Sequence, residues 1–434
     1  MSKKPLFFHG WIILAISFAA MAIAYGARNS FSVFYVVILD EFGWSRAGTA
    51  GVFSVNVVVY GIAAPFAGAL VDRFGPKKVL LTGATILALT IASCSLVNTI
   101  VHLYLLFGLV GAIGTALIGY PVNAAVLPHW FVRRRGMAFG IFTSGFGLSF
   151  LTVSLVQYFV SKFGWRMSFI LLGILIAVIL LPLIALFSRH RPEDVGLFPD
   201  GTHPSKKVKM SSGWAKGPMV VDEEWTSTDW SLRKAMRTYQ FWCLFFATFC
   251  IFGFVETLVV VHQVALMRDV GFSTSFVTSV VLLLGIMMAL GNLGGIVSDK
   301  IGREKTFTIG CLLSILGLFV LLVLEQSHAS WISYLYVVSF GLGAGISGPV
   351  LGAASADMFQ GRYFGSINGF LSLGYGLGGV IGAWCGGFVF DTTKNYSIAL
   401  IAAILVTCVA FTLLWIAAPR RIRRLARKEN LGMI

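Results

Sequence analysis

The apolar residues of this chain gather in long runs, and the charged residues lie mainly in the short segments between them. A helix of about twenty apolar residues is long enough to cross a lipid bilayer. The pattern predicts twelve such helices, at about 11–38, 47–71, 79–97, 101–128, 136–161, 166–188, 239–267, 275–298, 306–325, 331–356, 364–389 and 396–418. We therefore predict an all-α membrane protein.

The composition supports this fold class and argues against a soluble protein. Apolar residues make up 57% of the chain and charged residues 12%, whereas about a quarter of the residues in a soluble domain are charged. A net charge of +15 would suggest nucleic-acid binding in a soluble protein. Here the cations lie beside apolar spans, so we expect a lipid bilayer as the partner and no nucleic acid. The six cysteines and seven histidines show no ligand spacing, and we predict no metal site and no cofactor.

Lys and Arg residues are distributed unevenly between the two sides of the predicted membrane. If the N-terminus is cytoplasmic, one of the 33 lies within a span, and five face outside: Arg46, Lys162, Arg166, Arg268 and Lys394. All the others then lie on the cytoplasmic side, as the positive-inside rule requires. We expect both termini in the cytoplasm and a plasma-membrane location, such as a bacterial inner membrane.

A polar segment, 189–237, is rich in Pro, Gly, Ser, Lys and Glu and separates the first six spans from the last six. We interpret it as a cytoplasmic linker between an N-terminal bundle, 1–188, and a C-terminal bundle, 238–434, with a basic cytoplasmic tail. The sequence leaves open whether the linker is ordered or regulatory.

The two halves match each other at a nearly constant offset, which indicates an internal duplication. The clearest match is a loop motif that recurs 227 residues later. Its residues are Gly68, Asp72, Arg73 and Gly75 in the first half and Asp299, Lys300, Gly302 and Arg303 in the second. Two similar bundles suit alternating access, in which the halves rock around a site near the middle of the membrane.

Two interpretations of the repeated loop are open. Its acid lies at the cytoplasmic end of a span and can pair with a neighbouring helix end, so that breaking the contact would gate opening. Its cations also hold the loop on the cytoplasmic side. Span 11 adds four glycines on one helix face, for which static packing and a sliding contact are both open: Gly374, Gly378, Gly382 and Gly386.

The doubled loop, the six-plus-six arrangement and the central linker resemble the major facilitator superfamily over essentially the whole chain. A narrower resemblance lies in His129-Trp130-Phe131-Val132-Arg133-Arg134-Arg135-Gly136-Met137-Ala138-Phe139-Gly140. This segment is similar to one in monocarboxylate transporters and oxalate/formate exchangers, and Gly10-Trp11 matches part of the motif that opens their span 1. The resemblance implies carriage of small organic anions, with a proton or by exchange.

One departure from that group concerns span 8. Monocarboxylate carriers place an arginine there to hold the substrate carboxylate, but residues 275–298 contain no Arg or Lys. The anion must therefore be held elsewhere, or the substrate is not a simple monocarboxylate.

Two formal charges remain deep within the spans, Arg28 in span 1 and Glu256 in the repeat-related span 7. Such residues are costly to insert and are candidates for a functional site. We assign the substrate carboxylate to Arg28, whose planar guanidinium suits it, and proton coupling to Glu256. Burial favours the protonated form of a carboxyl group and a nearby arginine favours the ionised form, so substrate at Arg28 would promote protonation of Glu256. A purely structural Arg–Glu pair is the alternative.

Other polar residues at similar depth are candidates for the wall of a central cavity, although polar residues in spans more often hold helices together. The substrate-binding candidates are Tyr25, Asn29, Tyr120, Asn123, Asn292, Asn368 and Tyr375. His262 could relay protons from Glu256 or pack between helices.

These observations favour a secondary active transporter of a small organic anion of the monocarboxylate type, coupled to a proton, with a monomer as the functional unit. The alternatives are an oxalate/formate-type exchanger, a drug or cation exporter with Glu256 as the binding charge, and a non-transporting sensor. No His-Glu-x-x-His pattern or paired aspartates are present, so we do not expect an enzyme.

Overall fold

The computed structural model describes residues 8–201, 219–327 and 329–424. Residues 202–218 of the predicted linker and the tail residues 425–434 lie outside the described residues. Within the described ranges, eleven helical segments are long and apolar enough to cross a membrane. The longest, α8 (Arg135–Phe187), is interrupted by Gly164, whose φ of 76° is incompatible with a helix. Because α8 comprises two spans that meet there, the predicted twelve-helix fold is confirmed.

The first six spans follow the predicted bounds to within a few residues. They are α1 (Gly10–Asn29) with α2 (Phe31–Phe42); α3 (Arg46–Phe74); α4 (Pro76–Ser93) with η1 (Cys94–Leu96); a fourth span of α5 (Ile100–Leu103), η2 (Tyr104–Val110), α6 (Gly111–Ile118) and α7 (Tyr120–Trp130); and the two arms of α8. The η2 segment is a π-helix.

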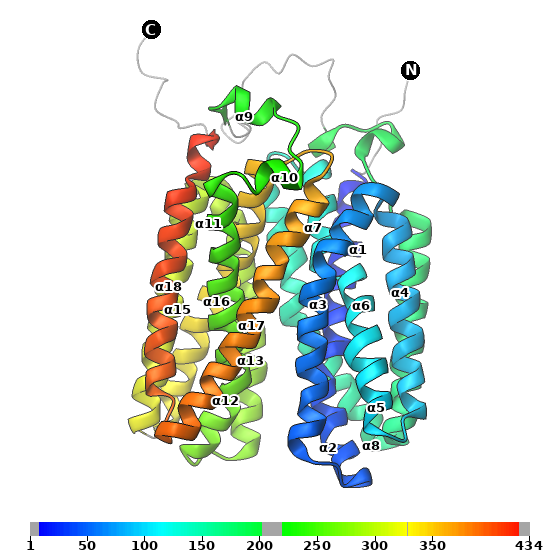
Figure 1. Cartoon of the computed structure of the whole chain (residues 1–434), viewed down its shortest axis with the longest axis vertical. Helices are drawn as coiled ribbons and strands as arrows, with labels where there is room; N and C mark the ends of the chain where they lie inside the picture. The colour runs from blue at the N-terminus through cyan, green and yellow to red at the C-terminus, as the bar shows by residue number, and fades with distance from the viewer. Residues whose placement is uncertain (1–7, 202–218, 328, 425–434) are drawn as a thin grey trace.

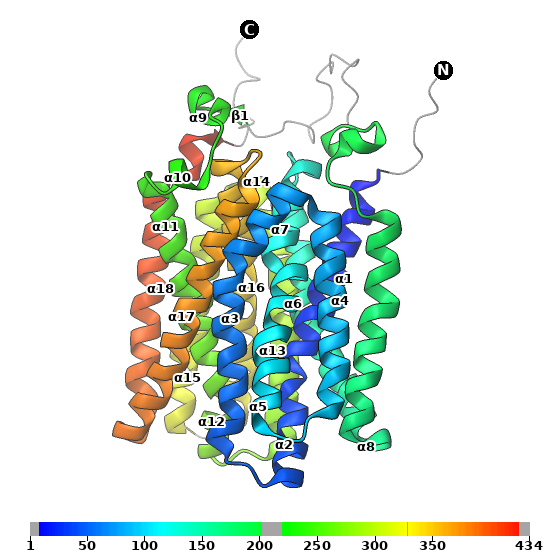
Figure 2. The ribbon, with the colours of Figure 1, turned by 45° about the vertical axis from the view of Figure 1, so that its right-hand side comes forward.

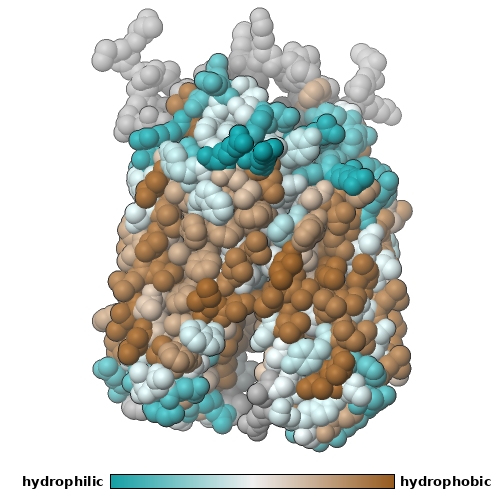
Figure 3. All heavy atoms as spheres, in the orientation of Figure 1, coloured by the Kyte–Doolittle hydropathy of each residue, from teal (hydrophilic) through white to brown (hydrophobic). Residues whose placement is uncertain are grey.

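The last six spans repeat this plan. They are α11 (Tyr239–Thr248) with the π-helical η5 (Phe249–Glu256) and α12 (Thr257–Asp269); α13 (Thr274–Asn292) with α14 (Gly294–Ile301); α15 (Arg303–Ser327); α16 (Ser330–Phe359); α17 (Phe364–Thr393); and α18 (Ser397–Ala417). The two groups of helices stand side by side, with the linker at one end, which we call the linker end (Figure 1). On the face shown in Figure 3, a broad apolar band lies between two polar ends, as a bilayer requires.

The halves meet along two pairs of spans that the duplication relates to each other. In one pair, α3 lies against α17 (Figure 2), and a Cβ at Gly61 would lie only 2.8 Å from the Cα of Gly376. In the other pair, the first arm of α8 lies against α13 and α14, and Gly136 contacts Gly295. Small residues permit this close approach of helix backbones. The glycine face of span 11 instead packs against span 7, since Gly378 contacts Gly253.

The described residues of the linker lie at the linker end. They form the short helices η3 (Pro192–Val195), η4 (Pro199–Gly201), α9 (Glu223–Ser227) and α10 (Leu232–Ala235). A further short helix, η6 (Pro419–Arg421), follows α18. Strand β1 (Met219–Val220) pairs antiparallel with β2 (Arg423–Arg424). Asp200 accepts hydrogen bonds from the backbone N–H groups of Val132 and Arg133, and Trp225 Nε1 donates to the carbonyl of Met358. The linker therefore contacts both halves.

Candidate functional site

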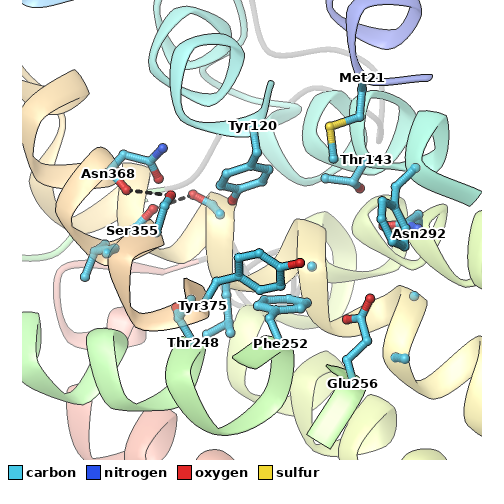
Figure 4. Close-up of a pocket in the computed structure, with 18 of the residues that line it drawn as sticks. Met21, Tyr120, Thr143, Thr248, Phe252, Glu256, Asn292, Ser355, Asn368 and Tyr375 are labelled. Carbon is cyan, nitrogen blue, oxygen red and sulfur yellow. Dashed lines mark hydrogen bonds between the residues drawn. The ribbon is translucent and has the colours of Figure 1, made fainter. Parts of the chain in front are cut away.

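A cavity of about 120 Å³ lies between the two halves. Six of the residues predicted for substrate binding or proton coupling line it (Figure 4): Tyr25, Tyr120, Glu256, Asn292, Asn368 and Tyr375. The apolar remainder of its wall includes Met21, Phe146, Phe252, Met288 and Leu351. Both halves contribute to the wall, so that movement of one half against the other must change the cavity.

Arg28 lies beside this cavity but does not line it. Its side chain is buried, with the guanidinium carbon 5.8, 5.4 and 5.4 Å from the ring centres of Tyr25, Phe53 and Tyr60. Nη2 donates to the Tyr375 hydroxyl across the interface between the halves, at 3.4 Å. Nε and Nη1 have no hydrogen-bond partner among the described residues. A guanidinium has five N–H donors, so this one retains capacity for a further acceptor.

Three tyrosines separate Arg28 from the cavity. The Tyr25 and Tyr60 hydroxyls are hydrogen-bonded at 2.8 Å, and the ring of Tyr60 meets that of Tyr375 edge to face, with the ring centres 6.0 Å apart. All three residues also line the cavity. Tyr25, Tyr60 and Tyr375 therefore contact both Arg28 and the cavity.

Glu256 is the last residue of the π-helical segment η5, and its carboxylate lies between Phe252 and Asn292 (Figure 4). Among the described residues that line the cavity, it carries the only formal charge. Arg28 and Glu256, both described, form no ion pair. The alternative of a structural Arg–Glu pair is therefore wrong in this conformation.

Three predicted residues do not line the cavity and bond elsewhere. Asn29 Nδ2 donates to Ser149 Oγ at 3.1 Å, Asn123 Nδ2 donates to the carbonyl of Gly119 at 2.9 Å, and His262 Nε2 donates to the carbonyl of Ala383 at 2.8 Å. The predicted place of Asn29 and Asn123 in the cavity wall is corrected by the structure, and the contact of His262 matches the alternative of packing between helices. Asn and His side chains within a membrane commonly satisfy backbone or neighbouring polar groups in this way.

The repeated loop motif makes two equivalent contacts between the halves. Asp72 accepts hydrogen bonds from the backbone N–H groups of Gly365 and Ser366, at 2.9 and 2.7 Å, at the start of α17. Asp299 accepts from those of Gly136 and Met137, at 2.9 and 2.8 Å, at the start of α8. A carboxylate at a helix N-terminus satisfies unpaired N–H groups and the helix dipole. The predicted pairing of each acid with a neighbouring helix end is confirmed.

The other motif residues serve the turns around these acids. Gly75 and Gly302 have φ values of 80° and 103°, which favour glycine. Gly75 lies at the turn between α3 and α4, and Gly302 at the turn between α14 and α15. Arg73 lies over the ring of Phe74, and Lys300 lies in the last turn of α14, which ends at Ile301. Gly68 packs against the backbone of α17, at the carbonyl of Gly365.

A buried charge network at the linker end was missed by sequence reasoning. Asp357 of α16 accepts hydrogen bonds from Arg135 Nη1 at 2.8 Å and from Arg303 Nε at 3.0 Å. Arg303 also pairs with Asp299 at 2.7 Å. Arg135 belongs to one half and the other three to the second, so the network joins the halves. The signal that could have found it is an acid just past the predicted end of span 10, facing an arginine-rich segment.

Together, these contacts close the linker end. The space-filling view shows the halves in contact there and separated at the opposite end (Figure 3). Sequence reasoning also missed several cavity residues that no charge distinguishes, Tyr60, Thr143, Phe252 and Ser355 among them.

Comparison with known proteins places the chain in a family. The sequence profile of the Major Facilitator Superfamily matches residues 17–352 and 263–432. Monocarboxylate transporter 13 of Rattus norvegicus is 25% identical over 401 residues, which are 91% of this chain and 85% of that protein. The oxalate:formate antiporter of Oxalobacter formigenes is 25% identical over 431 residues, which are 97% of this chain and 94% of that one.

A solved structure has the same fold. The proton:xylose symporter XylE bound to 6-bromo-6-deoxy-D-glucose matches with a TM-score of 0.69 at 13% identity, covering 94% of this chain and 95% of that one. The matching family and these relatives are transporters, and the suspected resemblance to monocarboxylate and oxalate/formate carriers is confirmed. This multi-pass membrane protein belongs to the major facilitator superfamily.

Proposed function

We propose that this protein is a secondary active transporter of a small organic anion of the monocarboxylate type, the class that includes lactate and pyruvate. The observation that carries the proposal is Arg28, a buried cation without an acidic partner among the described residues, at the edge of a cavity shared by both halves. A substrate carboxylate would supply the acceptor that Nε and Nη1 lack, because carboxylates match the guanidinium geometry.

Proton-coupled symport is the second part of the proposal, with Glu256 as the proton site. Its carboxylate lines the cavity without an ion-pair partner among the described residues. A carboxylate and a substrate anion in one apolar cavity repel each other, so protonation of Glu256 would favour anion binding. The two cargoes would then move together.

The two bundles, 1–188 and 238–434, would rock against each other in alternating access. We propose that the linker end is cytoplasmic, because most of the Lys and Arg residues lie there. The Asp72, Asp299 and Asp357 contacts would then hold the cytoplasmic gate shut in an outward-open conformation. One chain contains the whole cavity, which supports a monomer as the functional unit.

Two other transport modes have support. Exchange without a proton, as the name of the oxalate:formate antiporter describes for that relative, would use the same Arg28 site. Export of an organic cation is favoured by one observation: Glu256 and several aromatic rings line the cavity, whereas no Lys or Arg among the described residues does.

The test is uptake of labelled acids into proteoliposomes with and without an inward proton gradient, with a labelled organic cation in parallel. Accumulation of a monocarboxylate that follows the gradient and is lost in Arg28→Ala supports the proposal. Gradient-independent exchange supports the exchanger. Transport of the cation alone, unaffected by Arg28→Ala, overturns the anion assignment.

A further inference from the structure

The walls of the cavity indicate which kind of acid fits it. Resting on the proposed function, we infer that the substrate is a monocarboxylate with a bulky, ring-bearing apolar body, such as an aryl-substituted 2-oxo acid. A dicarboxylate or an acid of two or three carbons matches the cavity less well. The inference rests on the distribution of charge in the cavity, on its apolar wall and on its volume.

Charge is available for a single carboxylate. Arg28 contacts the tyrosines of the wall, and the described residues that line the cavity include neither Lys nor Arg. Among those described residues, the acid Glu256 carries the only formal charge. A second carboxylate on the substrate would lack a cationic partner and would be repelled by Glu256 whenever that group is ionised, so a dicarboxylate is disfavoured.

Apart from a few polar residues, Asn292, Ser355 and Asn368 among them, the wall is apolar and rich in rings and thioethers. Its members come from both halves: Met21, Phe146, Phe252, Met288, Leu351 and Leu371. The rings of Tyr120, Tyr375 and Phe252 all face the centre of the cavity (Figure 4). Faces and edges of aromatic rings favour a second ring placed between them, and thioethers adapt to its shape. This part of the cavity therefore suits the apolar body of an amphipathic acid.

The volume also favours a larger solute. The cavity volume of about 120 Å³ is about ten times the space that one water molecule requires. A three-carbon acid would leave much of the apolar wall in contact with water, at a cost proportional to the exposed area. An aryl-substituted acid would cover that wall and displace the water.

Gly348 offers a way to change the volume without disturbing the helices. A Cβ at this position would lie 3.4 Å from Asn292 Oδ1 and 3.7 Å from Phe252 Cζ, which are ordinary contacts. By comparison, a Cβ at Gly352 would lie 2.7 Å from the Tyr120 hydroxyl and would force a rearrangement. Gly348→Ala therefore fits the fold and removes space beside Phe252.

The experiment compares labelled phenylpyruvate, pyruvate and oxalate in proteoliposomes that contain the full-length protein. We expect kcat/KM for phenylpyruvate to exceed that for pyruvate at least about ten-fold, the discrimination that an apolar pocket gives for small differences in side chain. Gly348→Ala should lower kcat/KM for phenylpyruvate several-fold and change kcat/KM for pyruvate less than two-fold. Gly387→Ala, whose added Cβ would meet only His262 at 3.9 Å, is the matched control and should change neither.

Other outcomes separate this inference from the proposed function. Equal or faster transport of pyruvate or oxalate overturns the ring-bearing substrate and leaves the anion transporter intact. Transport of phenylpyruvate that persists unchanged in Arg28→Ala, or failure of every acid to cross, overturns the proposed function itself. Folding of Gly348→Ala is judged by size-exclusion chromatography in detergent. If this variant does not fold, Phe252→Leu must lower kcat/KM for phenylpyruvate selectively. An equal loss of kcat/KM for phenylpyruvate and pyruvate contradicts the inference.

Discussion

Asp72 and Asp299 occupy the same position in opposite halves, and each binds the first backbone N–H groups of a span in the other half. The two recipient sites, Gly365 and Gly136, are themselves repeat-related, being 229 residues apart. The duplication has therefore produced two equivalent carboxylate–helix contacts across the interface between the halves. Each contact joins a carboxylate to a helix N-terminus, and Asp299 also pairs with Arg303.

Asp72→Asn should weaken the closure of the linker end. Loss of the charge at a helix N-terminus costs about 1–2 kcal/mol in partly buried geometry, a factor of about five to thirty in the closed population. A Ser355→Cys reporter in the cavity wall should then react faster with an impermeant maleimide added from the linker side. Asp391→Asn, an exposed acid in the last turns of α17, is the control and should not change the rate. An unchanged rate in both Asp72→Asn and Asp299→Asn would contradict the gating role.

Arg28→Ala should abolish saturable binding of the carried acid, and Arg28→Lys should retain only a fraction of it. Hydrogen bonds to a charged group contribute about 1.5–3 kcal/mol, so the affinity should fall at least about ten-fold. Lysine keeps the charge but lacks the planar guanidinium with its paired N–H donors. Binding can be measured by isothermal calorimetry on detergent-solubilised protein, with Arg233→Ala in the exposed linker as the control. Unaltered affinity in Arg28→Ala would remove this residue from the site.

Glu256→Gln should separate exchange from accumulation. The neutral amide imitates the protonated carboxyl and cannot release a proton, so exchange of labelled for unlabelled acid should persist while gradient-driven accumulation is lost. Both are measured in the same proteoliposomes, with Glu223→Gln in the exposed linker as a control. Accumulation that survives the substitution would exclude Glu256 as the proton site.

Asp357→Ala should destabilise the protein much more than loss of a surface pair. It leaves Arg135 and Arg303 without their shared carboxylate, and breaking a buried ion pair from one side costs about 3–5 kcal/mol. Arg166→Ala removes the ion pair with Glu41, in which the two side chains are 44% and 39% exposed, and should cost about 0–1 kcal/mol. The comparison is made by thermal unfolding in detergent. Similar melting temperatures for the two variants would show that the network contributes little.

Docking of the first part of the linker should weaken as the pH falls below about 6.5, the ordinary pKa of histidine. Burial, and secondly the charge of Arg191, lower the pKa of His190 in the docked state, and Asp194 opposes them. The released segment binds the proton more readily, so acid favours release, whereas above that pH both states are neutral and docking is constant. Proteolysis of the linker should therefore be faster at pH 5.5 than at pH 7.5, and His190→Gln should remove most of this difference.

Much of the fold was predictable because its signals are local. The spans, the duplication and the two charges within spans all follow from apolar runs and from residue types at given positions. The site was predictable only in part, since a polar residue in a span can face either a cavity or a neighbouring helix. Tyr120 and Asn123 are three residues apart, yet Tyr120 lines the cavity and Asn123 caps backbone carbonyls in its own span.

The sequence by itself determined that this protein crosses the membrane twelve times in two related halves, and that Arg28 and Glu256 lie deep within the spans. Those properties follow from the cost of placing polar groups in hydrocarbon, which acts on each segment separately. Only the tertiary structure decided that Arg28 bonds Tyr375 and not Glu256, and that Asp357 is shared by two arginines from opposite halves. Such pairings depend on helix rotation and on contacts between segments far apart in the chain, which arise only when the two bundles pack together.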